Sequence, residues 1–359
     1  MLPKLTVIMP AYNAGRTIER ALKSIREQDY PQDLVEILVL DGGSTDNTRD
    51  IAEKYAAKVI NNPEKLPESA KALAIRQCEG DYALYIDTDE YFIREDSLMA
   101  RVDVFLQHPE VKVITATGKI SLKEANGVTK YSNYVSDPFS FFMYKLNGND
   151  REKELKRKYN YEKYTDYIIF SYEEGETLPL FDAAMNMFDM AYVRVLMEEN
   201  GFDTNGENAS DDTAFKNFAS NIFENVVRKS MCSAMLEQDY IYHDPAESFS
   251  SFASKMRWRV YNNVFTPEGE GVGFASRSVA YKRLQQRRIW YILYSCLIIP
   301  VLVHSIVLVF IRHDVRMLMH FWFNELVMFW IGIYMICKII GITPKRKTGY
   351  GKRATDRKG

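Results

Sequence analysis

Two aspartates follow an apolar run in the N-terminal third of the chain. Residues 82–86 are predicted to form a buried strand, and Asp87 and Asp89 come directly after it with Thr88 between them. Two carboxylates one residue apart at the end of a buried strand cannot both face the core without a large desolvation cost. We therefore expect them to meet a cation. A hard divalent ion there would bridge diphosphate oxygens and neutralise the charge that builds up as a nucleotide leaves.

Two earlier strand ends carry short polar loops, PAYNAG at residues 10–15 and DGGSTD at residues 41–46. Ligands of open α/β sheets bind beyond the carboxyl ends of the strands, so we expect both loops to share the edge that carries the aspartate pair. Asp41 can accept hydrogen bonds from a base or ribose, and Gly42 lets backbone approach a ligand. Alternatively, Ser44 or Thr45 is the N-cap of the next helix, with Asp46 favouring its dipole.

The elements that must position these residues alternate between strand and helix patterns. Apolar runs at residues 5–9, 35–40, 82–86 and 111–116 are separated by stretches of helical periodicity. This βαβ pattern predicts an α/β fold with a mostly parallel central sheet and helices on its faces. A GxGxxG motif is missing after the first strand, which weakens a nicotinamide or flavin interpretation.

Bulk composition fits one large folded domain with sequence left over. The chain has 359 residues, 47% hydrophobic, with a formal net charge of -2, so no global field favours a nucleic-acid partner. The four cysteines are far apart and form no metal-binding spacing, so we predict that they are unpaired. The first residues carry no basic, long apolar or cleavage-site pattern, and we expect the catalytic part to stay in the cytoplasm.

Residues 119–180 break the α/β pattern with a charged, aromatic-rich segment. The segment is interpreted as an insertion, either a solvated helix with aromatic packing or an element that binds an acceptor or contacts the membrane. Residues 249–264 alternate aromatic and basic side chains. This pattern is typical of a helix at a headgroup interface, and equally of a packed amphipathic helix.

The C-terminal part changes to long apolar runs. Residues 289–311 and 317–340 are each long enough to cross a hydrocarbon core of about 30 Å, and the short link between them favours a helical hairpin. Lysines and arginines flank both runs and outnumber the charges in the link, so both ends are predicted to be cytoplasmic. A buried helical pair in a soluble protein is the alternative. Asn324 and Glu325 lie within the second run, where they could mark a helix contact or a lipid-phosphate path.

The first part of the chain resembles a known family. VIMPAYNAGRTIERALKSIREQDYP, followed by VEILVLDGGSTDNTRDIAEKY and LYIDTDE, is similar to the glycosyltransferase family 2 catalytic domain, which has the GT-A fold. The resemblance is dense over residues 4–117 and looser to about residue 260. It implies inverting transfer from a nucleoside-diphosphate sugar of UDP or GDP type, with Mn²⁺ or Mg²⁺.

The resemblance also implies roles for individual residues. Pro10, Tyr12 and Asn13 would line the nucleotide pocket, and Asp41 would contact the base. Gly42, Ser44 and Thr88 are also predicted to bind the nucleotide sugar. The metal and ribose site would be formed by Asp87 and Asp89. A basic position beside the donor phosphates matches Lys71, and His243 resembles a histidine that completes metal binding in many relatives. A satisfied loop residue is the alternative for His243.

Inverting transfer needs a base that removes the proton of the attacking acceptor hydroxyl. The family places a Glu-Asp pair at a helix start, and the sequence SDDTAF puts Asp211 and Asp212 there. The second acid aligns with the base, so Asp212 is the predicted base. In the alternative interpretation the pair only caps the helix. The Gln-x-x-Arg-Trp motif of processive synthases lacks its glutamine here, which favours transfer of a single sugar.

Together these features predict an integral membrane glycosyltransferase. The predicted regions are a GT-A domain at 1–245, an interfacial helix and linker at 246–286, two transmembrane helices at 287–342, and a basic cytoplasmic tail at 343–359. The acceptor is expected to be a lipid, for example a polyprenyl phosphate or lipid-linked saccharide. Two alternatives remain: a tethered transferase acting on surface polysaccharide or protein, and a non-catalytic membrane scaffold with a degenerate fold.

Overall fold

The computed structural model describes residues 1–145, 151–179, 185–203, 213–245, 248–265 and 282–345. Asp211 and Asp212, the predicted base and its neighbour, lie outside these ranges. The chain divides into two compact units. The first, here the catalytic unit, combines Met1–Ile120 with Asn149–Asp244, and the second, the C-terminal unit, combines Ser121–Gly148 with Pro245–Gly359.

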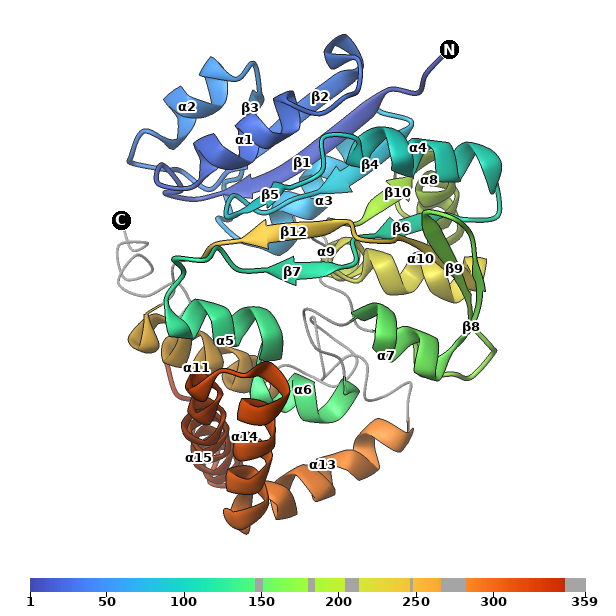
Figure 1. The fold of residues 1–359 in the computed structure, drawn as a ribbon. Coiled ribbons are helices and arrows are strands. Elements are labelled where there is room, and N and C mark those ends of the chain that lie inside the picture. The colour runs from blue at the N-terminus through green and yellow to red at the C-terminus, as the bar shows by residue number, and fades with distance from the viewer. Residues whose placement is uncertain (146–150, 180–184, 204–212, 246–247, 266–281, 346–359) are drawn as a thin grey trace. The chain divides into compact units, whose positions relative to one another are not determined.

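The catalytic unit is built on a mixed sheet with strand order β3-β2-β1-β4-β10-β6-β11-β9-β8 (Figure 1). The four strands at the β3 end run parallel, whereas β10 runs antiparallel to both of its neighbours. The strand bounds are β1 Leu5–Ala11, β2 Val35–Asp41, β3 Lys58–Asn61, β4 Tyr82–Tyr85, β6 Val113–Thr115, β8 Asn160–Lys163, β9 Tyr167–Ser171, β10 Met187–Asp189 and β11 Cys232–Leu236.

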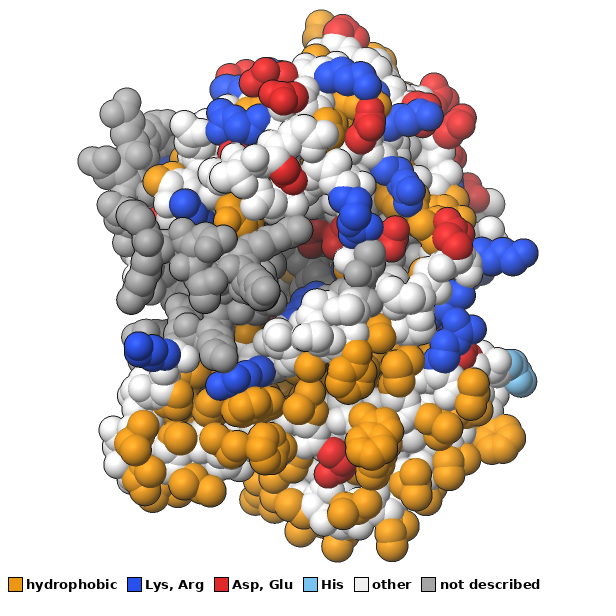
Figure 2. Space-filling model, turned by 90° about the vertical axis from the view of Figure 1, so that its left-hand side faces the viewer, with side chains coloured by type: hydrophobic (Ala, Val, Ile, Leu, Met, Phe, Trp, Pro, Cys, Tyr) orange, Lys and Arg blue, Asp and Glu red, His pale blue; other side chains and the backbone are white. Residues whose placement is uncertain are grey.

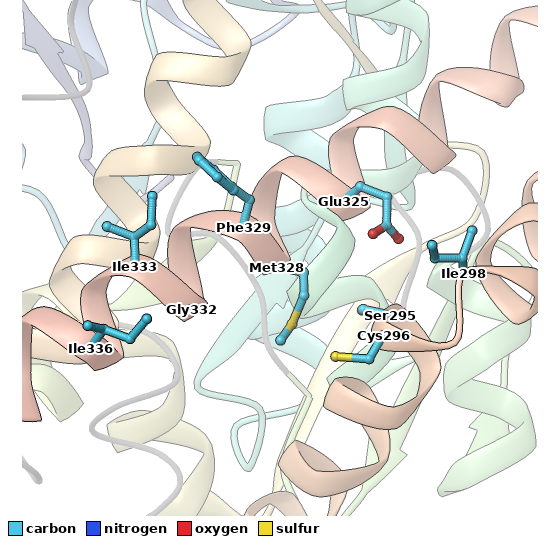
Figure 3. Close-up of a pocket in the computed structure, with 9 residues that line it drawn as sticks. All are labelled: Ser295, Cys296, Ile298, Glu325, Met328, Phe329, Gly332, Ile333 and Ile336. Carbon is cyan, nitrogen blue, oxygen red and sulfur yellow. The ribbon is translucent and has the colours of Figure 1, made fainter.

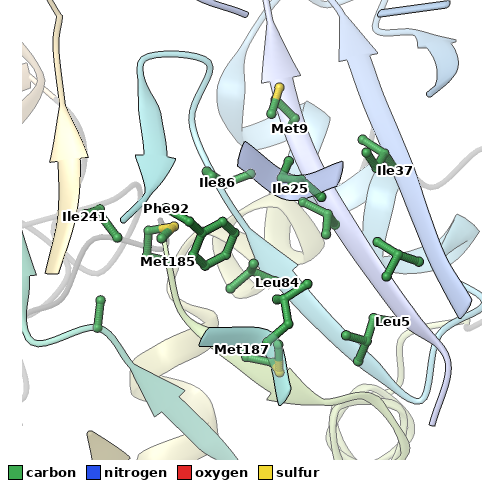
Figure 4. Close-up of a cluster of buried hydrophobic side chains, with 14 of the residues drawn as sticks. Leu5, Met9, Ile25, Ile37, Leu84, Ile86, Phe92, Met185, Met187 and Ile241 are labelled. Atoms are coloured by element: carbon green, nitrogen blue, oxygen red, sulfur yellow. The ribbon is translucent and has the colours of Figure 1, made fainter. Parts of the chain in front are cut away.

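Apolar side chains on both faces explain why β1 and β2 are central in the parallel half. In β1, Leu5, Val7, Ile8 and Met9 are all almost completely buried, as expected of a strand covered on both sides. Figure 4 shows this core cluster, in which strand residues meet Ile25 of α1 (Ile18–Arg26). The hydrophobic runs of the sequence therefore fix the sheet that carries the polar loops.

Strand register brings the carboxyl ends of three strands to one edge. Ala11, the last residue of β1, pairs with Asp41, the last residue of β2. On the other side of β1, Ile8 pairs with Tyr85 at the end of β4. The loop after β1 therefore lies between the loop after β2 and the segment that begins at Asp87, as the sequence predicts.

A small second sheet, with order β5-β12-β7, lies in the same unit. Its strands are β5 Glu90–Phe92, β7 Gly118–Ile120 and β12 Tyr240–His243. It begins directly after the aspartate pair, because Glu90 follows Asp89. The remaining helices of the catalytic unit are α2 Thr48–Lys54, α3 Pro67–Gln77, α4 Ser97–Gln107, α7 Arg151–Lys158, α8 Met190–Glu199, α9 Thr213–Ser220 and α10 Ile222–Ser230, with a 3-10 turn at Gln32–Leu34.

The C-terminal unit is helical in its described part. It consists of α5 Gly127–Val135, α6 Pro138–Tyr144, α11 Phe249–Phe265, α13 Lys282–Cys296, α14 Ile299–Arg312 and α15 Met319–Ile339, with a 3-10 turn at Val315–Leu318. The charged, aromatic-rich segment at 119–180 is thus shared between the units. Its first part forms α5 and α6, which pack on α13 and α15, and its second part forms α7, β8 and β9 of the catalytic unit.

The first predicted span, residues 289–311, is not one straight helix. The chain bends by 89° between α13 and α14. Ile298 has a positive φ of 61° and Pro300 stands in the first turn of α14, so the hydrogen-bond ladder is interrupted there. By length and composition, Val315–Ile339 is one helix able to cross a membrane, and the bent pair would count as a second only if it is a single broken span. Helices of this kind also occur in the cores of soluble proteins.

Candidate active site

The loops after β1 and β2 are joined by hydrogen bonds through Asn13. Its backbone N–H donates to the Ser44 hydroxyl at 2.8 Å, and its side-chain oxygen accepts the Thr45 N–H at 2.8 Å. Asn13 has a φ of 48°, which turns its backbone toward the second loop, and asparagine tolerates this region better than most residues. The Gly15 N–H adds a bond of 3.0 Å to Asp46. The two loops therefore form one polar rim joined by hydrogen bonds.

Asp41 supplies a fully buried carboxylate beneath this rim. The Ser44 hydroxyl and N–H both donate to it, at 2.5 and 3.1 Å, and the Arg49 guanidinium pairs with it at 3.0 Å. A buried carboxylate needs such partners to offset its desolvation. Arg49 is held in turn by Asn61 at 2.8 Å. Arg49 was not predicted from sequence, although its place one helical turn beyond Asp46 could have indicated that it faces the loop.

Ser44 and Thr45 do not cap the following helix, so that alternative is wrong. α2 begins at Thr48 with Asn47 as its N-cap residue, and Asp46 accepts the Thr48 N–H at 3.1 Å. Ser44 and Thr45 belong to the loop before α2, in which Gly43 turns the chain with a φ of 83°. Ser44 and Thr45 are thereby available to the Asn13 loop.

Aromatic and basic side chains border the same loop. A Cβ atom at Gly42 would stand 3.4 Å from Cδ2 of the Tyr12 ring, so Tyr12 covers this glycine. A Cβ atom at Gly43 would stand 3.8 Å from the Lys65 ammonium nitrogen. Pro10 lies past the last β1–β4 pair, where its missing N–H costs no ladder bond. Lys65 was not predicted from sequence, because nothing in its local pattern distinguishes it from other surface lysines.

The aspartate pair forms a tight turn between β4 and β5. Glu90 closes the turn, since its N–H donates to the Asp87 carbonyl at 3.1 Å and its carboxylate accepts the Asp87 N–H at 3.2 Å. The Asp87 side chain is exposed, and those of Thr88 and Asp89 are partly exposed. This carboxylate pair therefore leaves the core, as the desolvation argument requires.

Glu90 is a buried acid that was not predicted from sequence as a site residue. Its carboxylate pairs with Lys119 of β7 at 2.7 Å, and its side chain is fully enclosed. Burial raises the pKa of Glu90, the Lys119 charge opposes that rise, and Asp87 and Asp89 add to it. The pair anchors the small sheet beneath the aspartate turn.

His243 lies beside Asp89, although the two are far apart in sequence. The His243 Nε2 atom is 3.9 Å from the Asp89 carboxylate, and the Asp244 N–H donates to the Asp89 carbonyl at 2.8 Å. The approach follows from strand pairing, because His243 is opposite Glu90 in the antiparallel β5–β12 pair. Within the described residues, no group of three or more His, Cys, Asp or Glu side chains could hold a metal by itself.

The remaining predicted residues lie on α3 and before α9. Lys71 is a half-buried residue of α3. Asp212 immediately precedes the described start of α9, which packs on α3. Lys216 of α9 forms an ion pair of 2.5 Å with Glu64, the neighbour of Lys65. This pair ties the start of α9 to the loop that borders Gly43.

Comparison with known proteins relates this fold and site to glycosyltransferases. Residues 6–171 match the model of the family described as glycosyl transferase family 2. A poly(ribitol-phosphate) beta-N-acetylglucosaminyltransferase, TarS, of Staphylococcus aureus is 33% identical over 121 residues, which are 32% of this chain and 21% of that protein. A GalNAc(5)-diNAcBac-PP-undecaprenol beta-1,3-glucosyltransferase of Campylobacter jejuni is 33% identical over 96 residues, 25% of this chain and 30% of that protein.

The structure of a Pyrobaculum calidifontis mannosyltransferase in complex with GDP-Man and Mn²⁺ has a TM-score of 0.50 and 17% identity, over 92% of this chain and 88% of that one. At this identity the likeness shows the fold. The α/β GT-A prediction is therefore confirmed, with a mixed rather than a mostly parallel sheet. The chain thus carries, at residues 6–171, a domain that matches family 2 glycosyltransferases, which are enzymes of the transferase class. It spans only 21% of the length of TarS.

Proposed function

We propose that the chain is an inverting, metal-dependent glycosyltransferase that moves a single sugar from a UDP or GDP sugar to a membrane-associated, lipid-linked acceptor. The observation that carries the proposal is the convergence of two polar features at one sheet edge. The loops joined by Asn13 and Ser44 form one, and the Asp89–His243 pair at the end of β4 forms the other.

The nucleotide would bind against the rim of the first two loops. Tyr12 places its ring beside Gly42, and Asp41 offers a carboxylate that Arg49 and Ser44 hold in place. Pro10 and Asn13 would complete this wall. Lys65 and Lys71 would supply positive charge for the diphosphate. The family resemblance supports these roles, and the geometry around Gly42 and Gly43 is compatible with them.

The donor chemistry of the aspartate turn fits a divalent cation. Magnesium is usually bound through one or two carboxylates together with substrate phosphates, so a complete protein cage is not required. Asp89 and His243 would hold Mn²⁺ or Mg²⁺, with Asp87 and Thr88 directed to the ribose or phosphate side. When bound, the ion would stabilise the charge on the leaving diphosphate.

Asp212 would accept the proton of the acceptor hydroxyl as that oxygen attacks the anomeric carbon. Asp211 would help to orient the Asp212 carboxylate. The ion pair between Lys216 and Glu64 supports a role for this helix start at the site. It joins α9 to the segment around Lys65, which borders Gly43. The aspartate is the proton acceptor in this scheme, and the diphosphate leaves from the opposite face of the sugar.

A lipid acceptor is supported by the apolar C-terminal unit. Of the exposed large hydrophobic side chains in the described residues, most lie between Ile289 and Ile342. The Campylobacter relative is named for an undecaprenol-linked acceptor, which is compatible with this choice. The catalytic unit and both chain ends are placed on the cytoplasmic side, as the flanking lysines and arginines suggest. A tethered transferase for surface polysaccharide is the second candidate, favoured by the poly(ribitol-phosphate) transferase relative.

A donor screen followed by product partition tests the proposal. Thermal shift with Mn²⁺ present should identify one UDP or GDP sugar that raises the melting temperature, because a selective ligand stabilises the folded state. With that donor radiolabelled, native membranes should give a labelled product in the organic phase that mild acid releases. Label in a water-soluble polymer would favour the second candidate. No metal-dependent shift and no transfer with any donor would contradict both.

A further inference from the structure

The C-terminal unit exposes an unusual amount of apolar surface. In the described residues, 22 of the 28 exposed large hydrophobic side chains lie between Ile289 and Ile342. They come from α13, α14, α15, the connections between them and the residues directly after α15, and Figure 2 shows hydrophobic side chains gathered over one region of the surface. Contiguous apolar patches of this kind are rare on soluble monomers and mark a partner or a membrane.

One face of α15 is covered along most of its length by α11, an amphipathic helix that also carries basic residues. Phe249 of α11 stacks on Phe323, and Phe252 meets the same ring edge to face. Val264, near the other end of α11, accepts a hydrogen bond of 2.7 Å from Lys338. Between them, the Arg257 guanidinium lies 3.9 Å from the Trp330 ring centre and donates to the Tyr334 hydroxyl at 2.8 Å. The two helices therefore run side by side.

This packing opposes a crossing by α15. α11 carries Lys255, Arg257 and Arg259, together with serines and asparagines. If α15 spanned the hydrocarbon core, α11 would be carried into it. Each charge at the bilayer centre costs about 2.5–3.5 kcal/mol on insertion scales, and α11 brings several at once. A crossing would therefore require α11 to separate from α15.

In the described part of the C-terminal unit, α13 and α14 are each too short to cross. α14 has 14 residues, which is about 21 Å of helix against a core of about 30 Å. The 89° bend prevents α13 from extending it in a straight line. A hairpin of two spans therefore has only one helix of sufficient length, and α11 covers that helix.

The exposed apolar stripe of α15 lies opposite α11. Trp322, Phe329 and Ile336 are seven residues apart and more than half exposed, so they share one face about 100° or more from the face of Phe323, Trp330 and Tyr334.

An apolar groove of about 400 Å³ opens beside this stripe, between the end of α13 and α15 (Figure 3). Cys296, Ile298, Met328 and Ile333 are among the residues that line it. Glu325 also borders the groove and accepts a hydrogen bond of 3.3 Å from Asn324. The free-energy cost of a carboxylate is small at headgroup depth and large at the bilayer centre.

The charge of the unit is suited to an anionic lipid surface. Residues 249–265 and 282–345 contain eleven Lys or Arg and only two Asp or Glu. Trp290 and Trp322 are both exposed, and tryptophan favours the membrane interface. Basic residues combined with interfacial aromatics are typical of elements that lie in the headgroup region rather than across the bilayer.

We propose that the C-terminal unit is a monotopic membrane anchor, which inserts α13, α14 and the exposed face of α15 into one leaflet of an anionic bilayer and does not cross it. The inference deepens the membrane location in the proposed function and rests on it. It replaces the hairpin of two spans predicted from sequence. The connection between α14 and α15 then stays on the side of the membrane that carries the catalytic unit.

Side-specific labelling tests the topology. Full-length protein lacking Cys296 and Cys337 (both changed to Ser) would carry either His313→Cys in the connection between α14 and α15, or Leu106→Cys on the exposed surface of α4 as a reference. In sealed inverted membrane vesicles, an impermeant maleimide should label both positions to a similar extent. Labelling of His313→Cys only after detergent treatment would overturn the proposal in favour of a crossing hairpin.

Vesicle flotation tests the surface itself. Wild-type protein should float with vesicles that contain phosphatidylglycerol and bind less to pure phosphatidylcholine. The pair Phe329→Glu and Ile336→Glu should lower the floated fraction at least tenfold. Val195→Glu, at an exposed apolar position of α8, is the matched control and should float like wild type. A wild-type protein that stays in the aqueous phase as a dimer would overturn the proposal, because a second copy would then cover the face.

Donor hydrolysis in detergent separates this inference from the proposed function. The charged pair should retain wild-type hydrolysis, since both positions belong to the C-terminal unit and the donor residues belong to the catalytic unit. Loss of vesicle binding with hydrolysis intact supports the anchor. Wild-type protein that floats but hydrolyses no nucleotide sugar would contradict the proposed function and leave the anchor standing.

Discussion

The backbone N–H of Asn13 donates a hydrogen bond of 2.8 Å to the hydroxyl of Ser44, and that hydroxyl donates to Asp41. One side chain therefore links the loop after β1, the loop after β2 and the buried carboxylate beneath them. Because a single hydroxyl holds three parts together, its removal should loosen the whole donor rim.

We expect Ser44→Ala to weaken donor binding more than turnover. Loss of the hydroxyl leaves the Asn13 N–H without its partner, a cost of about 1–2 kcal/mol, or roughly tenfold in donor KM. Steady-state kinetics with varied donor concentration measures this. Ser251→Ala, which alters only hydrogen bonds within its own turn, is the control. A fall in kcat with unchanged KM would argue against a binding role for the rim.

Asp89→Ala should abolish turnover and metal-dependent donor binding together, because it removes the carboxylate that lies 3.9 Å from His243 Nε2. His243→Ala should be milder and raise the Mn²⁺ concentration needed for half-maximal activity. Calorimetric titration of the donor with and without chelator measures both effects. Asp33→Ala, an exposed acid in the 3-10 turn, serves as control. Donor binding by Asp89→Ala that still depends on metal would exclude Asp89 as a ligand.

Asp212→Asn should lose turnover while donor affinity stays close to wild type. The amide keeps the shape of the side chain but cannot accept the proton of the acceptor. Donor affinity by calorimetry and transfer with radiolabelled sugar are measured on the same preparation. If donor affinity falls as much as it does in Asp89→Ala, the division of roles between the two aspartates is wrong.

Arg101→Met should destabilise the catalytic unit. Arg101 is fully buried, pairs with Asp239 at 2.5 Å and donates to the Met185 carbonyl at 2.8 Å. Removing one partner leaves a buried charge without compensation, which costs about 3–5 kcal/mol. Urea unfolding measures the loss, and Asp239→Leu added to the same chain should restore part of it. Lys54→Met at an exposed pair is the control, with an unchanged midpoint expected.

The four free thiols should differ in their rates of alkylation. Burial raises the pKa of the Cys232 thiol to about 11, and it also raises the pKa of the Cys78 thiol. A raised pKa keeps a thiol protonated and unreactive at about pH 8, so these two should react only after unfolding. Cys296 is exposed and should react first in detergent. Mass spectrometry after timed iodoacetamide treatment gives the order, and early labelling of Cys232 would contradict its burial.

The parallel half of the sheet was predictable because its signal is local. The run at residues 5–9 and the helical spacing of Ile18, Ala21, Leu22 and Ile25 each fall within one element, and the structure has β1 and α1 there. The strand-end rule then placed the Asn13 and Asp41 loops at one edge.

The antiparallel and cross-chain features were not predictable in the same way. β10 pairs with Leu84 of β4, about a hundred residues earlier, and β9 pairs with Cys232 of β11. Such pairings leave no periodic trace in either segment. The ion pair of Glu90 with Lys119 likewise joins two strands that are distant in sequence, so neither segment indicates it. The bend at Ile298 was missed because composition alone suggests one continuous apolar helix.

The course of the chain between the units limits how the protein can be dissected. The chain leaves the catalytic unit after Ile120, forms α5 and α6 in the C-terminal unit, and returns to the catalytic unit at Asn149. The Tyr131 hydroxyl of α5 is hydrogen-bonded to His320 of α15 at 3.0 Å. A chain shortened to residues 1–244 would keep these two helices without the surface that shelters their aromatic rings, and it should precipitate. Replacing residues 121–148 with a short glycine-serine bridge in the same truncation should yield a catalytic fragment that stays in solution.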